Sequence, residues 1–100
     1  MTFFEIHKDK GKTFLQWIDP VPQVIADHKI AHRFPYWQVI DESSDTVNGK
    51  KRTTYELERS EVIGTVDPNV WCGIDHHTFP LSISDNGEIS VGPAQTYCQE

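Results

Sequence analysis

Apolar and polar residues alternate over several short stretches of the chain, each bounded by glycine, proline or asparagine. The clearest case lies late in the chain, where Leu81–Ile83 and Ile89–Val91 place a serine between two apolar residues. These stretches flank Asp85-Asn86-Gly87, a sequence typical of a tight hairpin turn. The pattern predicts a β-hairpin with its apolar residues facing inward and its serines facing outward.

The same two-residue period predicts further strands. Asn48-Gly49 is a second hairpin-type turn, and Thr53–Glu58 follows it with Tyr55 and Leu57 on one face. Glu61–Val66 extends that strand past an irregularity at Ser60. The remaining predicted strands cover residues 3–6, 13–18, 36–40 and 95–98, with turns at 8–12 and 67–69 and a polar stretch at 41–45.

Residues 23–34 fit both a helix and a strand. Asp19 and Pro20 suit the start of a helix, and Pro35 suits its end. The residues between them also alternate in polarity, and on a helical wheel their apolar members do not gather on one side, which weakens the helix interpretation. The boundary signals lead us to expect a short helix here.

The pattern as a whole predicts about six to eight short strands and at most one or two short helices. One hundred residues provide one hydrophobic core, so we expect residues 1–100 to form a single β-rich domain. The expected fold class is α+β, predominantly antiparallel β, built as a small sandwich or a partly open barrel.

Charge is divided unevenly along the chain. All nine lysine and arginine residues lie at or before Arg59, whereas six of the fifteen acidic residues follow it, so residues 60–100 carry the formal charge of −6. An acidic surface attracts cationic partners and repels nucleic acid phosphates, so we expect no direct nucleic acid binding. No apolar run is long enough for a membrane span and no secretory signal is evident, which leads us to expect a cytoplasmic protein without membrane contact.

The densest group of reactive residues is the segment WCGIDHH at positions 71–77. Cys72 and His76 have the spacing at which a turn can present a thiolate and an imidazole to one zinc ion, with Cys98, Asp75 or His77 completing the set. The predicted metal ligands are therefore Cys72, His76 and Cys98, and no other cofactor is expected. The sequence leaves open whether the two cysteines are free, bridged or metal-bound. It contains no nucleophile elbow and no phosphate-binding loop, so no catalytic residue is predicted.

Tyr36 and Trp37 are neighbours on a predicted strand, so they face opposite sides of the sheet and only one can enter its core. An exposed aromatic residue beside acidic residues is typical of a protein-binding hot spot. Our first hypothesis is a small acidic, non-enzymatic protein-binding module, such as an inhibitor, immunity or accessory protein, that masks a basic surface of a partner protein. The residues expected to contact that partner are Tyr36, Trp37, Asp67, Trp71, Asp75, Asp85 and Glu88.

Two other hypotheses belong to different classes. The first is a zinc-binding protein or small hydrolase with a Cys/His site at residues 72–77. The second is a ligand pocket inside the barrel, lined by Trp17, Trp37 and Trp71. Under the protein-binding hypothesis, Asp75 and Glu88 are expected to be largely solvated. The oligomeric state is not predicted.

Overall fold

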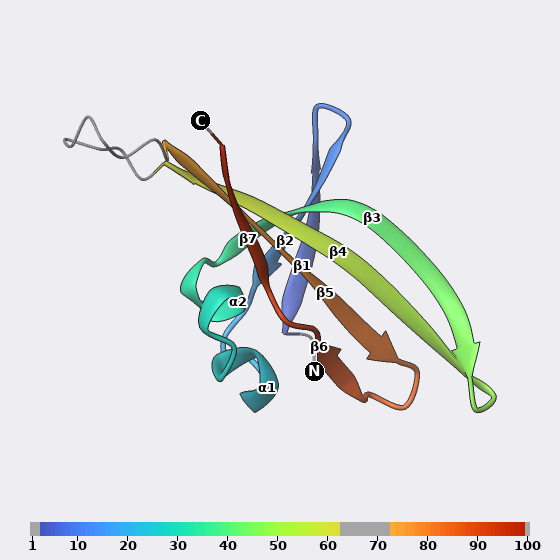
Figure 1. The fold of residues 1–100 in the computed structure, drawn as a ribbon. Helices are drawn as coiled ribbons and strands as arrows, with labels where there is room; N and C mark the ends of the chain where they lie inside the picture. Colours follow the sequence, from blue (N-terminus) through green and yellow to red (C-terminus); the bar gives the residue numbers. More distant parts are fainter. Residues whose placement is uncertain (1–2, 63–72, 100) are drawn as a thin grey trace.

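The computed structural model describes residues 3–62 and 73–99, which form one open, curved antiparallel sheet with two short helices against one of its faces (Figure 1). The predicted fold class is confirmed, and the β part is a single open sheet. The strands are β1 (Phe4–Asp9), β2 (Lys12–Trp17), β3 (Tyr36–Val47), β4 (Lys50–Val62), β5 (Ile74–Ser84), β6 (Ile89–Val91) and β7 (Gln95–Gln99), and the helices are α1 (Gln23–Ala26) and α2 (Lys29–Arg33).

Neighbouring strands follow the order β1-β2-β3-β4-β5-β6, and β7 also pairs with β5. Strand β6 pairs with Leu81–Ile83, and β7 pairs with Ile74–Thr78, so the two short strands lie one after the other along the same edge of β5. The long strands β3, β4 and β5 form the middle of the sheet (Figure 1).

Both predicted hairpin turns are present. Asn48 and Gly49 have φ angles of 53° and 77°, the left-handed conformation that a two-residue hairpin turn requires. The later hairpin pairs Leu81 with Val91 and Ile83 with Ile89, as the alternation predicts, and Gly87 in its turn has φ of 85°.

The hydrophobic core lies between the helices and one face of the sheet, which we call the inner face; the opposite face is the outer face. Trp17 and Trp37 anchor α2, because both indole Nε1 atoms donate to the carbonyl oxygen of Ala31, at 2.7 Å and 3.3 Å. The buried core residues are Leu15, Trp17, Ile25, Ala31, Trp37, Leu57, Phe79 and Leu81.

The helix expected at residues 23–34 is present but divided in two. It begins after Pro22 rather than at Asp19 and Pro20, and α2 ends at Arg33, shortly before Pro35, as predicted. His28 caps α2, since its Nδ1 accepts a hydrogen bond from the backbone N–H of Ala31 at 3.0 Å.

The middle strands run further than the alternation suggested. Residues 41–45, expected as a polar stretch after a strand, belong to β3 and continue to pair with β4 beyond a bulge between Val39 and Asp41. Strand β4 passes through Ser60 without a break. The predicted continuation at 63–66 and the turn at 67–69 lie outside the described residues. Neither helix in the described ranges has the length and apolar character needed to cross a membrane.

Candidate functional site

An aromatic cluster lies on the outer face where β1, β2 and β3 adjoin. The ring of Tyr36 stacks on Phe14 at 5.4 Å between centroids, and His7 lies 6.2 Å from Tyr36. Tyr36 is 37% exposed, whereas Trp37 is 1% exposed. The prediction that only one of these two neighbours enters the core is confirmed. Trp37, which was also expected to contact a partner, lies in the core instead and has no surface to offer one.

A shallow hollow connects this cluster to the middle of the sheet. It has a volume of about 250 Å³ and is bordered by Phe14, Tyr36, Gln38, Glu58, Arg59 and Ser60. The guanidinium of Arg59 is held there by a hydrogen bond to the carbonyl oxygen of Tyr36 at 3.1 Å. The hydroxyl of Ser60 lies 2.9 Å from Nδ1 of His76, whose ring stacks on Tyr97 at 4.8 Å. Tyr97 is 55% exposed, so aromatic surface is present on both sides of the hollow.

Carboxylates surround the aromatic cluster on the same face. Glu58 pairs with Gln38, and Glu56 pairs with Asp41, so these acidic side chains lie beside one another across β3 and β4. Glu5, at the other side of the cluster, lies 3.3 Å from Nε2 of His7. Within residues 3–62 and 73–99, no salt bridge involves Glu56, Glu58 or Asp41. This part of the outer face is therefore both aromatic and acidic.

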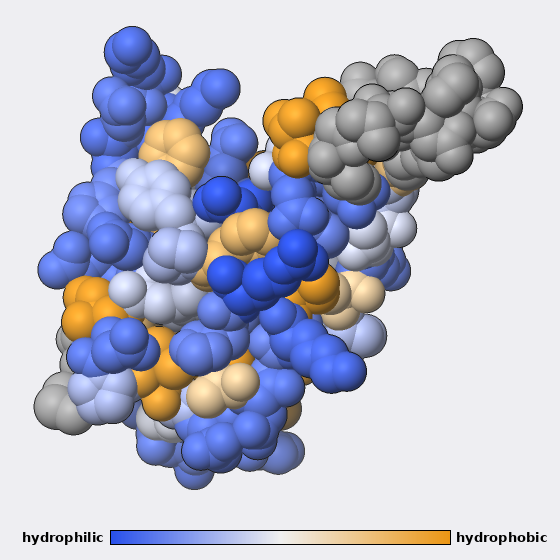
Figure 2. Space-filling view, turned by 90° about the vertical axis from the view of Figure 1, so that its left-hand side faces the viewer, coloured by the Kyte–Doolittle hydropathy of each residue, from blue (hydrophilic) through white to orange (hydrophobic). Residues whose placement is uncertain are grey.

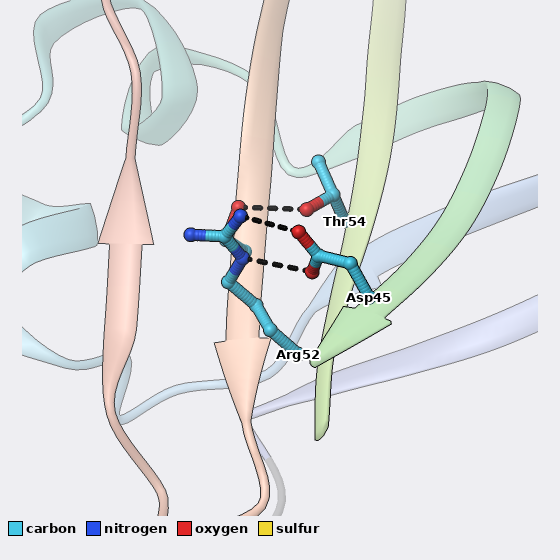
Figure 3. Close-up of polar contacts among 4 residues, drawn as sticks. Asp45, Arg52 and Thr54 are labelled. Atoms are coloured by element: carbon cyan, nitrogen blue, oxygen red, sulfur yellow. Dashed lines mark hydrogen bonds and ion pairs between the residues drawn. The ribbon is translucent and has the colours of Figure 1, made fainter. Parts of the chain in front are cut away.

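The far end of β3 and β4 is different, because charges there are paired. Arg52 makes two hydrogen bonds to Asp45, Nε to Oδ1 at 3.1 Å and Nη2 to Oδ2 at 2.7 Å (Figure 3). Hydrogen bonding to Asp45, and then its charge, raise the pKa of Arg52 above its ordinary value. The hydroxyls of Thr54 and Ser82 lie 3.0 Å apart beside this pair. The carboxylate of Asp45 is thus paired with a cation of the neighbouring strand.

The acidic residues of the late segment do not gather at one place. Asp85 and Glu88 are exposed in the turn after β5, where the backbone N–H of Asp85 donates to the carbonyl oxygen of Lys51 at 3.0 Å. Asp75 lies at the opposite end of β5 and is half-buried, so the expectation that it is largely solvated is wrong, whereas Glu88 is exposed as expected. Asp67 and Trp71 lie outside the described residues.

The predicted zinc ligands are also separated. His76 stacks on Tyr97 on the outer face, whereas Cys98 pairs with Asp75 on the inner side of the sheet. The structure does not bring His76 and Cys98 together, because successive residues of a strand point to opposite faces. Cys98 is disulfide-bonded, and a sulfur in that state offers no thiolate to a metal. Cys72 lies outside the described residues.

A different set of metal-ligand side chains meets on the inner face. Glu61, Asp75 and His77 each offer one ligand atom, and these atoms lie within 4.8 Å of one another. His77 is 3% exposed, and its Nδ1 lies 2.9 Å from the hydroxyl of Thr96. Its Nε2 is buried without a hydrogen-bond partner in the part of the chain that the structure describes. The Asp75-x-His77 spacing puts both residues on one face of a strand, and this signal was present in the sequence.

An apolar hollow of about 530 Å³ opens between β1, the segment before α1 and the β5–β6 hairpin. It is lined by Phe3, Phe4, Pro20, Val21, Pro22, Ile83, Gly87 and Ile89, so neither Trp17 nor Trp37 borders it. Its lining side chains carry no polar group that could orient a ligand. Seen from the left-hand side of Figure 1, hydrophobic atoms form small patches between hydrophilic ones (Figure 2).

No family model, curated protein or solved structure matches this chain.

Proposed function

We propose that the protein is a non-enzymatic binding module that recognises another protein through the outer face of its sheet. The observation that carries this proposal is Tyr36, which is 37% exposed and stacks on Phe14 at the border of a hollow. A tyrosine in this setting presents a large, rigid surface with a polar end, and such residues are enriched among interface hot spots. Tyr97 offers a second exposed ring across the hollow.

The charges around Tyr36 favour a partner with a basic surface. Glu56, Glu58 and Asp41 lie on the same face as the ring, and Glu58 borders the hollow. Carboxylates at the rim of an interface accelerate association with a positively charged partner and exclude partners of like charge. Lysine or arginine side chains of the partner would also find favourable positions over the ring of Tyr36.

This arrangement suits the role of an inhibitor, immunity or accessory protein that masks a basic functional surface of its target. A cytoplasmic location, expected from the sequence, remains a prediction. The disulfide at Cys98 weighs against it, because disulfides are rare in reducing compartments. Trapping of thiols in intact cells, followed by mass spectrometry of the Cys98 peptide, measures the redox state there.

The function is tested by affinity capture from the native source with two baits, the wild-type chain and Tyr36→Ser. We expect the wild type to capture a protein partner with a basic surface, and elution at 0.5 M salt to release it, because surface charge attraction is screened at that concentration. Tyr36→Ser should capture at least about tenfold less, the loss typical of a hot-spot tyrosine.

The matched control is Val47→Ser, which changes another half-exposed residue of β3 at the far end of the strand. It should capture the partner as the wild type does. Equal capture by the wild type and Tyr36→Ser would contradict the proposed function. So would the absence of any protein that both the wild type and Val47→Ser capture.

A further inference from the structure

We propose that Glu61, Asp75 and His77 form a binding site for a divalent transition-metal ion, with zinc as the ion that these ligands suit best. The site lies on the inner face, opposite the proposed recognition surface, so either proposal can be refuted without affecting the other. It also differs from the cysteine-based site predicted from the sequence, since neither cysteine is needed.

Strand pairing brings the three side chains together. Glu61 lies directly opposite Asp75 in the β4–β5 register, and His77 follows two positions later on the same face of β5. Directly opposed and diagonal neighbours on one face are the positions at which side chains of adjacent strands meet. The resulting ligand atoms lie within 4.8 Å of one another, on two well-paired strands rather than on a loop.

His77 supplies the feature that distinguishes this cluster from an ordinary group of acids. The imidazole is 3% exposed, and its Nε2 is buried with no hydrogen-bond partner among residues 3–62 and 73–99. A buried polar atom without a partner costs free energy, which a metal–nitrogen bond would recover. Nδ1 lies 2.9 Å from the hydroxyl oxygen of Thr96. With Nδ1 protonated and donating to that oxygen, Nε2 is the nitrogen that can bind a metal, and the hydrogen bond fixes the ring's tautomer and orientation.

The donor set indicates the class of metal. One imidazole nitrogen and two carboxylates suit zinc and related transition-metal ions, whereas calcium and magnesium prefer sites made of oxygen ligands alone. Ligand atoms around tetrahedral zinc lie about 3.3 Å apart, so the cluster must contract slightly on binding. Glu61 can do this by turning away from Arg33, with which it forms a partly exposed ion pair at 3.1 Å. The metal ion would then neutralise the charge of Glu61 in place of Arg33.

The test is a zinc titration of the full chain against a chromophoric chelator, under non-reducing conditions that keep the disulfide of Cys98 intact. The informative variants are Glu61→Gln and Asp75→Asn, which keep side-chain volume and remove one charged ligand each. The control is Glu58→Gln, the same substitution on the same strand but on the outer face. Circular dichroism checks that each variant is folded, and these two isosteric substitutions are preferred to a truncation of His77 because that side chain is buried.

We expect the wild type and Glu58→Gln to bind one equivalent of zinc with affinities within about twofold of each other. Glu61→Gln and Asp75→Asn should each bind at least about tenfold more weakly, the size of effect seen when ligand sets are disturbed. Cobalt should replace zinc without a sulfur-to-cobalt charge-transfer band. Less than a tenth of an equivalent bound by the wild type, affinities unchanged in either ligand variant, or a sulfur-to-cobalt band would overturn the proposal.

Discussion

His28 connects α2 to the far edge of the sheet through the backbone of Gly92. Its Nε2 donates to the carbonyl oxygen of Gly92 at 2.9 Å, while its Nδ1 accepts from the backbone N–H of Ala31. The ring also packs at 5.2 Å from Phe79 in the core. One side chain therefore caps a helix and joins it to the segment between β6 and β7, 64 residues away in the sequence.

Replacement of this histidine should destabilise the fold. We expect His28→Ala to lower the free energy of unfolding by about 2 kcal/mol, because it removes a helix cap and a part-buried hydrogen bond worth about 1 kcal/mol each. Urea denaturation followed by tryptophan fluorescence measures the change. His32→Ala, at an exposed position of the same helix, should cost no more than about 0.5 kcal/mol. Equal effects of the two substitutions would contradict the stabilising role assigned to His28.

The helical segment illustrates what local sequence can and cannot determine. Residues 23–34 alternate in polarity like a strand, yet they carry helix boundary signals, and the sequence alone favours neither strongly. The structure settles the choice through distant groups: the carbonyl oxygen of Gly92 engages His28, and the indoles of Trp17 and Trp37 donate to Ala31. The break between α1 and α2 falls at His28, whose backbone is extended and whose ring contacts Gly92, a partner that local sequence does not reveal.

The phenol of Tyr55 should make stability depend on pH in the alkaline range. Burial raises the pKa of Tyr55 above its ordinary value of 10.0, and the nearby charge of Glu42 raises it further. A raised pKa in the folded state means that the protonated phenol is favoured there. Its contribution to stability is thus complete below pH 10 and is lost as the pH rises through the raised pKa.

Tyr55→Phe removes this titration while retaining the ring. The unfolding free energies of wild type and variant, measured by urea denaturation from pH 8 to pH 11.5, should differ by a constant amount up to about pH 9.5. Above that pH the wild type should lose stability relative to the variant. Lysine titration affects both proteins alike and cancels in the difference. Two curves that stay parallel over the whole range would contradict the assigned pKa shift.

Strand predictions succeeded where the cause is local. A two-residue period places Leu81 and Ile83 on one face whatever the rest of the chain does, and Asn48-Gly49 and Asn86-Gly87 favour tight turns by their own conformational preferences. Residues 41–45 gave no such signal. These residues form a strand because their backbone pairs with β4. Their side chains are exposed, so folding does not require apolar and polar residues to alternate there.

The candidate sites were harder to predict because they depend on which strands pair. Grouping acids by position in the sequence suggested a surface from residues 60–100, but pairing of β3 with β4 brings Asp41, Glu56 and Glu58 together instead. Likewise, neighbours in the sequence such as His76 and His77 are separated by the sheet, one beside Tyr97 and the other beside Thr96. Tyr36 is the part of the proposed recognition surface that local reasoning could identify.

Charge reversal on the outer face should slow binding without unfolding the protein. Glu56→Lys combined with Glu58→Lys replaces two half-buried carboxylates of β4, of which Glu58 borders the hollow. Because rim charges act mainly on the encounter of two proteins, the association rate should fall by about tenfold or more, while the dissociation rate changes less. The control pair is Lys50→Glu with Lys51→Glu, at exposed positions at the start of β4, beside the distant hairpin turn.

The decisive measurement is the association rate constant of the captured partner with these three proteins, determined by surface plasmon resonance at 50, 150 and 500 mM salt. If the outer face recognises a basic surface, the wild type and the Lys50/Lys51 pair should associate fast at low salt and slow down steeply as salt increases, whereas the Glu56/Glu58 pair should be slow throughout with a flat salt dependence. If the Lys50/Lys51 pair abolishes binding while the Glu56/Glu58 pair binds like the wild type, the recognition surface is not the one centred on Tyr36.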